Sequence, residues 1–155
     1  MFVRRKPDGY GATGICGVFD VRVLVGGRAR GRVFVLEEPL SFWGGVDPAT
    51  GEVIDRRHPQ AGTRVAGAIL VMPSGRGSSS SSSVLAEAIR AGTAPAGVVL
   101  READGIIALG AIVARELYGM TIPVVVADQD DYGRLVSGAT ASVDGERVVV
   151  PADDS

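Results

Sequence analysis

Alternating apolar and polar positions near both ends of the chain predict β-strands. Residues 18–25 and residues 30–36 each alternate with a period of two, and residues 26–27 are a pair of glycines between them. Because this is the period of a strand with one buried face, and because paired glycines favour a tight turn, the pattern predicts a β-hairpin. A second, weaker hairpin is predicted from residues 139–143 and 147–150, which flank an Asp-Gly pair.

The middle of the chain has short apolar runs that alternate with helical patterns. The runs at residues 66–72, 97–100 and 122–127 predict buried strands. Between them, residues 79–91 and 105–118 repeat apolar residues at helical spacing, and a glycine follows each segment. This order of elements predicts parallel strands joined by right-handed crossovers. The second helix is apolar on nearly every side, so we expect it to be deeply packed.

Together the two patterns predict a three-layer α/β fold, in which antiparallel hairpins pack on a small parallel βαβαβ unit. Ligands meet such a unit at the carboxyl ends of its parallel strands. The loop at residues 73–83 and the turns at residues 100–104 and 127–131 should therefore share one edge of the sheet. Asp104 stands where the second helix begins, and we expect it to be the N-cap of that helix.

The most informative motif follows the first parallel strand. Residues 71–78 read Val-Met-Pro-Ser-Gly-Arg-Gly-Ser, and a run of serines continues from there. Backbone N–H groups at a helix start attract anions and can stabilise an alkoxide, so Ser78 is a candidate base, with Gly77 and Ser79 in the same N–H cradle. Arg76 can pair with a carboxylate or a phosphate. The alternative is an ordinary N-cap serine in a low-complexity stretch.

Three other groups of residues have candidate chemistry. His58, the only histidine, lies in a polar loop, so a buried core position is less expected than usual. It is a candidate for substrate contact, with a plain loop residue as the alternative. Phe42 and Trp43 stand beside two glycines and could line a pocket, form an interface or cover the core. The acidic residues in 128–131 could bind a cation, although an exposed acidic turn is the better interpretation.

Composition narrows the classes of function. The 155 residues have a net charge of -2, whereas nucleic-acid-binding proteins usually have a basic excess. Cys16 is the only cysteine, and one cysteine cannot hold zinc or an iron–sulfur cluster alone. No apolar run reaches the ~20 residues of a membrane span, and no signal peptide is evident. We expect a cytoplasmic protein with no metal of its own and no nucleic-acid or membrane partner, with a flexible lead-in at 1–17 before one domain at 18–155.

Four separated motifs, in the same order, resemble the small subunit of the aconitase X family. They are Pro39–Gly51, Ile54–His58, Met72–Ser79 and Leu109–Ile112, and the resemblance extends over about residues 22–126. It implies that the domain is the swivelling β/β/α domain, equivalent to the last domain of aconitase. It also implies that a separate large subunit holds the iron–sulfur cluster, so this chain alone should be inactive.

The resemblance also implies a reaction and the residues that perform it. Members of the family dehydrate small hydroxy acids, and a serine of the swivelling domain removes the proton next to the carboxylate. The matching position is Ser78, with Ser79 and Gly77 in the anion cradle and with Arg76 and His58 as weaker candidates for substrate contact. Aconitase has an arginine where this chain has Ser80, so that role would pass to Arg76, to the large subunit or to backbone groups.

The resemblance leaves two substrates open. The uninterrupted serine run resembles the bacterial form that dehydrates cis-3-hydroxy-L-proline, which we favour. The alternative is the archaeal form, which dehydrates mevalonate 5-phosphate. A function of another class is also open, namely a swivelling domain that binds an anion and regulates a partner without catalysing a reaction.

Overall fold

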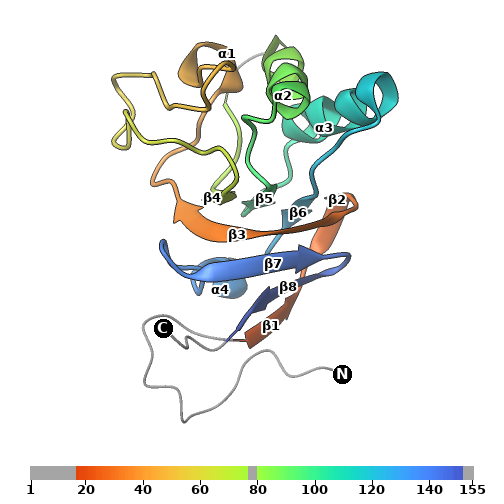
Figure 1. Ribbon diagram of the computed structural model, residues 1–155. Helices are drawn as coiled ribbons and strands as arrows, with labels where there is room; N and C mark the ends of the chain where they lie inside the picture. The colour runs from red at the N-terminus through yellow and green to blue at the C-terminus, as the bar shows by residue number, and fades with distance from the viewer. Residues whose placement is uncertain (1–16, 77–79, 152–155) are drawn as a thin grey trace.

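The computed structural model describes residues 17–76 and 80–151, which form a curved sheet with a layer of helices over part of it (Figure 1). The strands are β1 (Gly17–Asp20), β2 (Arg22–Val25), β3 (Arg28–Val35), β4 (Ile69–Met72), β5 (Gly97–Leu100), β6 (Val124–Val126), β7 (Thr140–Asp144) and β8 (Arg147–Val150). The helices are α1 (Phe42–Gly45), α2 (Ser80–Ala91), α3 (Gly105–Tyr118) and α4 (Gln129–Tyr132).

Within these residues the strands form one mixed sheet in the order β1-β8-β7-β3-β4-β5-β6-β2. Strands β3, β4, β5 and β6 are parallel to one another, and the remaining pairs are antiparallel. Strand β3 joins the two halves, because it pairs with β4 on one side and with β7 on the other. The predicted parallel unit and the predicted C-terminal hairpin, β7–β8, are both confirmed.

The hairpin predicted near the N-terminus is wrong. Strand β2 pairs with β6, with Val23 opposite Val125, whereas β3 pairs with β4 and β7. The segment before the two glycines is also divided at Val21, and its first part, β1, pairs with β8. The alternation of apolar and polar residues specifies which face of a strand is buried, but it does not specify which strand pairs with it. Here β1 and β2 cover the outer edges of β8 and β6, which would otherwise expose unpaired backbone groups.

Two apolar cores lie on opposite faces of the sheet. Leu70 belongs to the first core, with Leu85 of α2, between the parallel strands and the helices. Val71, the next residue, belongs to the second core, with Val148 of β8, inside the curl of the sheet. The three layers predicted from the sequence are therefore present. Strands β4 and β5 lie between two covered faces, and every one of their residues is buried.

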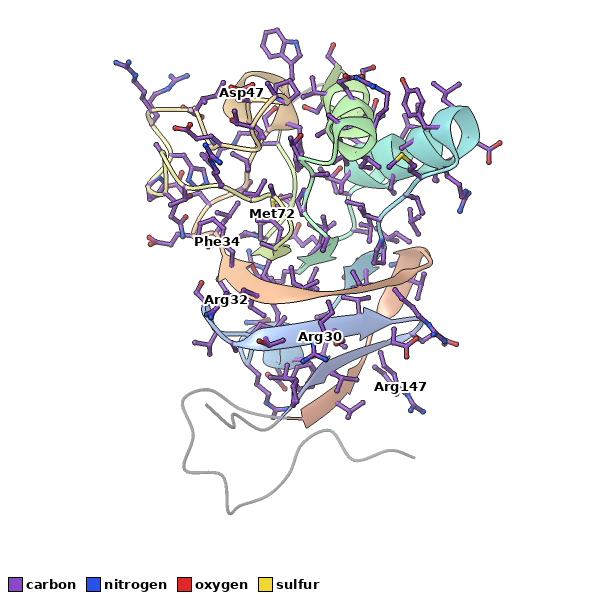
Figure 2. All side chains as sticks on the ribbon, in the orientation of Figure 1. Arg30, Arg32, Phe34, Asp47, Met72 and Arg147 are labelled. Atoms are coloured by element: carbon purple, nitrogen blue, oxygen red, sulfur yellow. The ribbon has the colours of Figure 1, made fainter. Side chains whose placement is uncertain are left out.

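The helices leave the antiparallel half of the sheet uncovered on its outer face. Arg28, Arg30 and Arg32 alternate with inward residues along β3, and all three are exposed. Figure 2 shows Arg30, Arg32 and Arg147 on this half, away from α1, α2 and α3, whereas Met72 lies at the end of β4 beneath those three helices. The functional motifs therefore belong to the half of the molecule that the helices cover.

Helix α3 has the predicted bounds but not the predicted burial. Asp104 is its N-cap and Gly119, at φ 68°, is its C-cap. Ile107 and Ala111 are buried on one side, but Leu109 is exposed and Leu117 is 67% exposed. The helix lies on one face of the sheet and packs against α2 on one side. Apolar residues on its remaining side therefore face outward.

Candidate functional site

Loops that follow neighbouring parallel strands meet at the carboxyl edge of the sheet. The carbonyl of Pro73, after β4, accepts hydrogen bonds from the N–H groups of Arg101 and Glu102, after β5, at 3.2 and 3.0 Å. The Arg101 guanidinium in turn lies over the ring of Tyr132, in α4 after β6, at 5.7 Å from the ring centroid. The three predicted loops therefore do share this edge.

The carboxylate of Asp104 connects two of these loops. Its Oδ1 accepts from the N–H groups of Ile106 and Ile107 at 2.9 and 3.1 Å, which makes it the N-cap of α3. Its Oδ2 accepts from the N–H of Gly75 at 3.0 Å. A Cβ on Gly75 would lie only 2.7 Å from Asp104 Oδ2 and 2.9 Å from Ile107 Cγ1. A residue with a side chain could not make this approach without displacing its neighbours.

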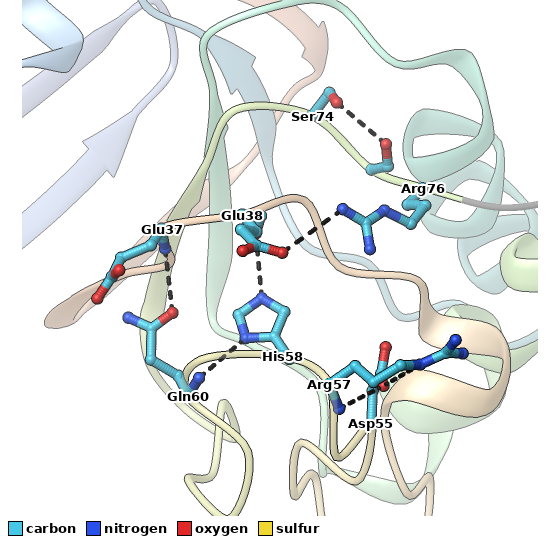
Figure 3. A network of polar contacts seen from close by, with 9 residues as sticks. Glu37, Glu38, Asp55, Arg57, His58, Gln60, Ser74 and Arg76 are labelled. Carbon is cyan, nitrogen blue, oxygen red and sulfur yellow. Dashed lines mark hydrogen bonds and ion pairs between the residues drawn. The ribbon is translucent and has the colours of Figure 1, made fainter.

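Arg76 lies beside the segment that leads from β3 into α1. Its N–H donates to the carbonyl of Leu40 at 3.2 Å, and Gly75 forms a parallel bridge with Leu40. The Arg76 guanidinium forms an ion pair with Glu38 at 3.8 Å, and about half of each side chain is exposed (Figure 3). An exposed ion pair of this length is weak, so a carboxylate or phosphate ligand could replace Glu38 as the partner of Arg76.

His58 is buried, with 4% of its surface exposed, although its polar loop favoured an exposed position. Its Nδ1 accepts from the N–H of Gln60 at 3.1 Å, so its Nε2 carries the hydrogen and donates to the carbonyl of Glu38 at 3.1 Å. Figure 3 shows His58 below Glu38, whereas Arg76 lies beside the Glu38 carboxylate. The ring therefore fixes the backbone of the residue that holds Arg76.

Gln60 reinforces the same segment. Its Oε1 accepts from the N–H of Glu37 at 3.0 Å, and its Nε2 donates to the carbonyl of Val35 at 2.7 Å. No local sequence pattern points to Gln60, because both of its partners lie more than 20 residues away in the chain.

Ser78, Ser79 and Gly77 lie outside the described residues. The chain is described again from Ser80, the first residue of α2, and Ser81 is fully buried. Trp43 N–H donates to Ser81 Oγ at 3.3 Å, the Ser81 and Ser41 hydroxyls are 2.9 Å apart, and Ser41 Oγ donates to the Trp43 carbonyl at 3.0 Å. These contacts anchor the start of α2 to α1. The burial of Ser81 could not be predicted from the sequence, because nothing local distinguishes one serine of the run from the next.

The structure also places the aromatic and acidic candidates. Trp43 is 62% exposed and does not cover the core, which Phe42 enters instead. Asp128 and Asp130 are exposed, as expected, but Asp131 is buried and forms an ion pair with Arg134 at 3.2 Å, and the segment is a short capped helix, α4. Within residues 17–76 and 80–151, no group of three or more His, Cys, Asp or Glu side chains could hold a metal ion.

In the same part of the chain, no helix combines the length and apolar character of a membrane span.

A model of the aconitase X swivel domain matches residues 18–151. The chain belongs to this family. Its fold agrees with a solved family structure, the holo-form of aconitase X from Thermococcus kodakaraensis. The TM-score is 0.76 and the identity 38%, and the match covers 86% of this chain and 98% of that one.

Curated relatives of this swivel domain have two different names. A cis-3-hydroxy-L-proline dehydratase of Pseudomonas aeruginosa is 54% identical over 103 residues, which are 66% of this chain and 18% of the relative. A dehydratase of the same name from Hypocrea jecorina is 43% identical, over 80% of this chain and 21% of the relative. The chain thus spans about a fifth of these two proteins. A phosphomevalonate dehydratase small subunit of Methanothermobacter thermautotrophicus is 42% identical, over 82% of this chain and 93% of the relative.

Proposed function

We propose that this swivel domain is the small subunit of an aconitase X-type hydro-lyase and that Ser78 is its proton acceptor. The observation that carries the proposal is the position of the serine run in the chain. It begins between Arg76, which is held at the carboxyl edge of the parallel strands, and Ser80, where α2 begins. Ligands bind α/β sheets at this edge, and the dehydratase names of the relatives support the reaction class.

The proposed reaction removes water from a hydroxy acid. The Ser78 Oγ, as the alkoxide, takes the proton from the carbon next to the carboxylate, and the electron pair of that C–H bond forms a carbon–carbon double bond. The hydroxyl group on the neighbouring carbon leaves with its own bonding pair and takes up one proton to become water, which balances the proton removed from carbon. N–H groups at the start of α2 and the helix dipole would lower the energy of the alkoxide, and Arg76 would bind the substrate carboxylate.

The proposal requires a partner. The described residues of this chain offer no metal site, so we assign the iron–sulfur cluster to a large subunit. When bound there, the cluster supplies a Lewis acid for the departing hydroxyl group. The Methanothermobacter relative is itself named a small subunit, which supports this division. We place the complex in the cytoplasm, and we expect the isolated chain to bind no cluster and to be inactive.

For the substrate we propose cis-3-hydroxy-L-proline. The support is the 54% identity to the Pseudomonas dehydratase of that name, together with the uninterrupted serines from Ser78 to Ser83. Mevalonate 5-phosphate is the second candidate, because this chain covers 93% of the Methanothermobacter small subunit. The test is to co-express the chain with a large subunit, purify the complex without oxygen and assay both compounds. Turnover of neither compound would favour a regulatory, anion-binding domain.

Replacing Ser78 tests the catalytic assignment. In the assembled complex, Ser78→Ala should lower kcat by roughly 10²- to 10⁴-fold, because the proton acceptor is lost. The matched control is Ser83→Ala, since Ser83 belongs to the same run but is exposed on α2. It should keep normal turnover. A Ser78→Ala complex that assembles fully and turns over at the normal rate would contradict the proposed role of Ser78.

A further inference from the structure

The chain that leads into the serine run is held on two sides at Gly75. On one side Gly75 bridges to Leu40, next to the segment that His58 supports. On the other side its N–H donates to Asp104 Oδ2 at 3.0 Å. The approach is close enough that a Cβ on Gly75 would overlap both Asp104 and Ile107. The position of the backbone at Gly75 is therefore determined by its neighbours.

Asp104 has more hydrogen bonds than an N-cap needs. One carboxylate oxygen, Oδ1, is enough to cap α3, because it accepts from both Ile106 and Ile107. The second oxygen is directed to Gly75, which lies 29 residues earlier in the chain. A serine or threonine cap would satisfy the helix equally well but would lack this second acceptor.

We propose that Asp104 is a positioning residue for the proton acceptor. This inference rests on the proposed function of Ser78. Gly75 is only three residues before Ser78 in the chain, so contacts that hold the Gly75 backbone limit the positions that Ser78 can reach. Proton transfer from carbon needs close alignment, and a displacement of about 1 Å can cost about 10²-fold in rate.

Two substitutions separate the bond to Gly75 from the cap. Asp104→Asn keeps the shape and the capping oxygen, but its amide group is a donor and would face the N–H of Gly75. Asp104→Ser also keeps a cap, but its hydroxyl is too short to accept hydrogen bonds from both the start of α3 and the N–H of Gly75. In the assembled complex we expect each variant to lower kcat by about 10- to 100-fold with little change in KM. The control, Asp144→Asn, removes the same charge from an exposed ion pair with Arg28 on the outer face of the sheet, and it should keep normal kcat.

Amide hydrogen exchange gives a readout that does not depend on catalysis. The Gly75 N–H should be protected in the unaltered chain and should exchange faster in Asp104→Asn and Asp104→Ser. The Ile106 and Ile107 N–H groups should stay protected in both variants, because the cap remains. The melting temperature and the fraction of assembled complex are measured on the same samples.

The outcomes are distinguishable from those for Ser78. If Asp104→Asn and Asp104→Ser assemble and keep normal kcat while Ser78→Ala is inactive, the positioning role is wrong and the proposed function stands. A loss of kcat that only follows loss of assembly would also overturn the positioning role, because it would show a structural effect. If Ser78→Ala is fully active, the proposed function fails, whatever the Asp104 variants do.

Discussion

Polar side chains at the carboxyl edge of the sheet bind backbone groups more often than one another. His58 contacts the carbonyl of Glu38 and the N–H of Gln60, and Asp104 contacts three N–H groups. Among the described residues, no buried side-chain nitrogen or oxygen lacks a hydrogen-bond partner. A buried polar group without a partner would cost about 1–3 kcal/mol. The complete set of hydrogen bonds therefore stabilises one arrangement of the loops.

Tyr132 provides a prediction at the residue scale. Burial raises the pKa of its phenol, and the nearby Arg101 guanidinium opposes part of that rise. The folded state therefore holds the phenol proton more tightly than the unfolded state does. The resulting stability is complete below the ordinary pKa of about 10 and is lost as the pH rises through the folded value.

The measurement is the near-ultraviolet phenolate absorbance of the unaltered chain minus that of Tyr132→Phe, titrated with base. The difference should have a midpoint above about 10. Arg101→Gln should move the midpoint higher still, because the opposing charge is gone. A midpoint at or below the ordinary value would show that the Tyr132 phenol is hydrated and that its burial has been overestimated.

At the scale of elements, the contact between α2 and α3 decides how the candidate site is supported. Helix α2 begins inside the serine run, at Ser80, and α3 begins at Gly105, directly after its cap Asp104. A Cβ on Gly110 of α3 would lie 2.9 Å from both Leu85 Cδ2 and the Ser82 carbonyl oxygen of α2. The two helices therefore approach as closely as a glycine permits, and the starts of both are held together above the sheet.

Gly110→Ala should destabilise the domain, because the added methyl group would push the helices apart. We expect a loss of about 1–3 kcal/mol in the free energy of unfolding, measured by denaturant titration. The matched control is Gly105→Ala at the start of the same helix, where a Cβ would meet nothing within 4 Å. It should be neutral or stabilise the domain by about 0.5 kcal/mol. Equal stability of the two variants would contradict the close packing at Gly110.

On the scale of the whole molecule, the N-terminal strands close the sheet. β1 lies on one edge and β2 on the other, yet only Val21 separates them in the chain. The sheet must therefore curl until its two edges are adjacent, and the second core fills the inside of the curl. Figure 1 shows the consequence, with β1 below and β2 at the level of the parallel strands.

A pair of engineered cysteines tests this topology. With Cys16 replaced by serine, Arg22→Cys and Val126→Cys should form a disulfide under mild oxidation, because the two residues are partners across β2 and β6. The control pair, Val23→Cys and Arg30→Cys, would be opposite each other only in a local hairpin. It should keep two free thiols, counted by thiol titration and peptide mass spectrometry. The reverse result would restore the hairpin and contradict the curled sheet.

The parallel βαβαβ unit, the C-terminal hairpin and the sheet edge that carries the candidate site follow from local sequence. The bounds of α3, its Asp104 cap, the β7–β8 hairpin and the shared edge of the strands agree with the structure. Each depends on interactions between residues that are close in the chain, or on the rule that parallel crossovers bring strand ends together. The role of Ser78 stays a prediction, since the described residues stop at Arg76 and resume at Ser80.

Only the tertiary structure decided the partners of the strands and the surroundings of the side chains. The alternation before and after Gly26 is compatible with a hairpin, yet β2 and β3 pair with strands more than 30 residues away. The burial of His58 and the exposed side of α3 depend in the same way on which distant segments pack nearby. Local pattern determines which face of an element is apolar, whereas the segment that covers the face is chosen by the free energy of the whole chain.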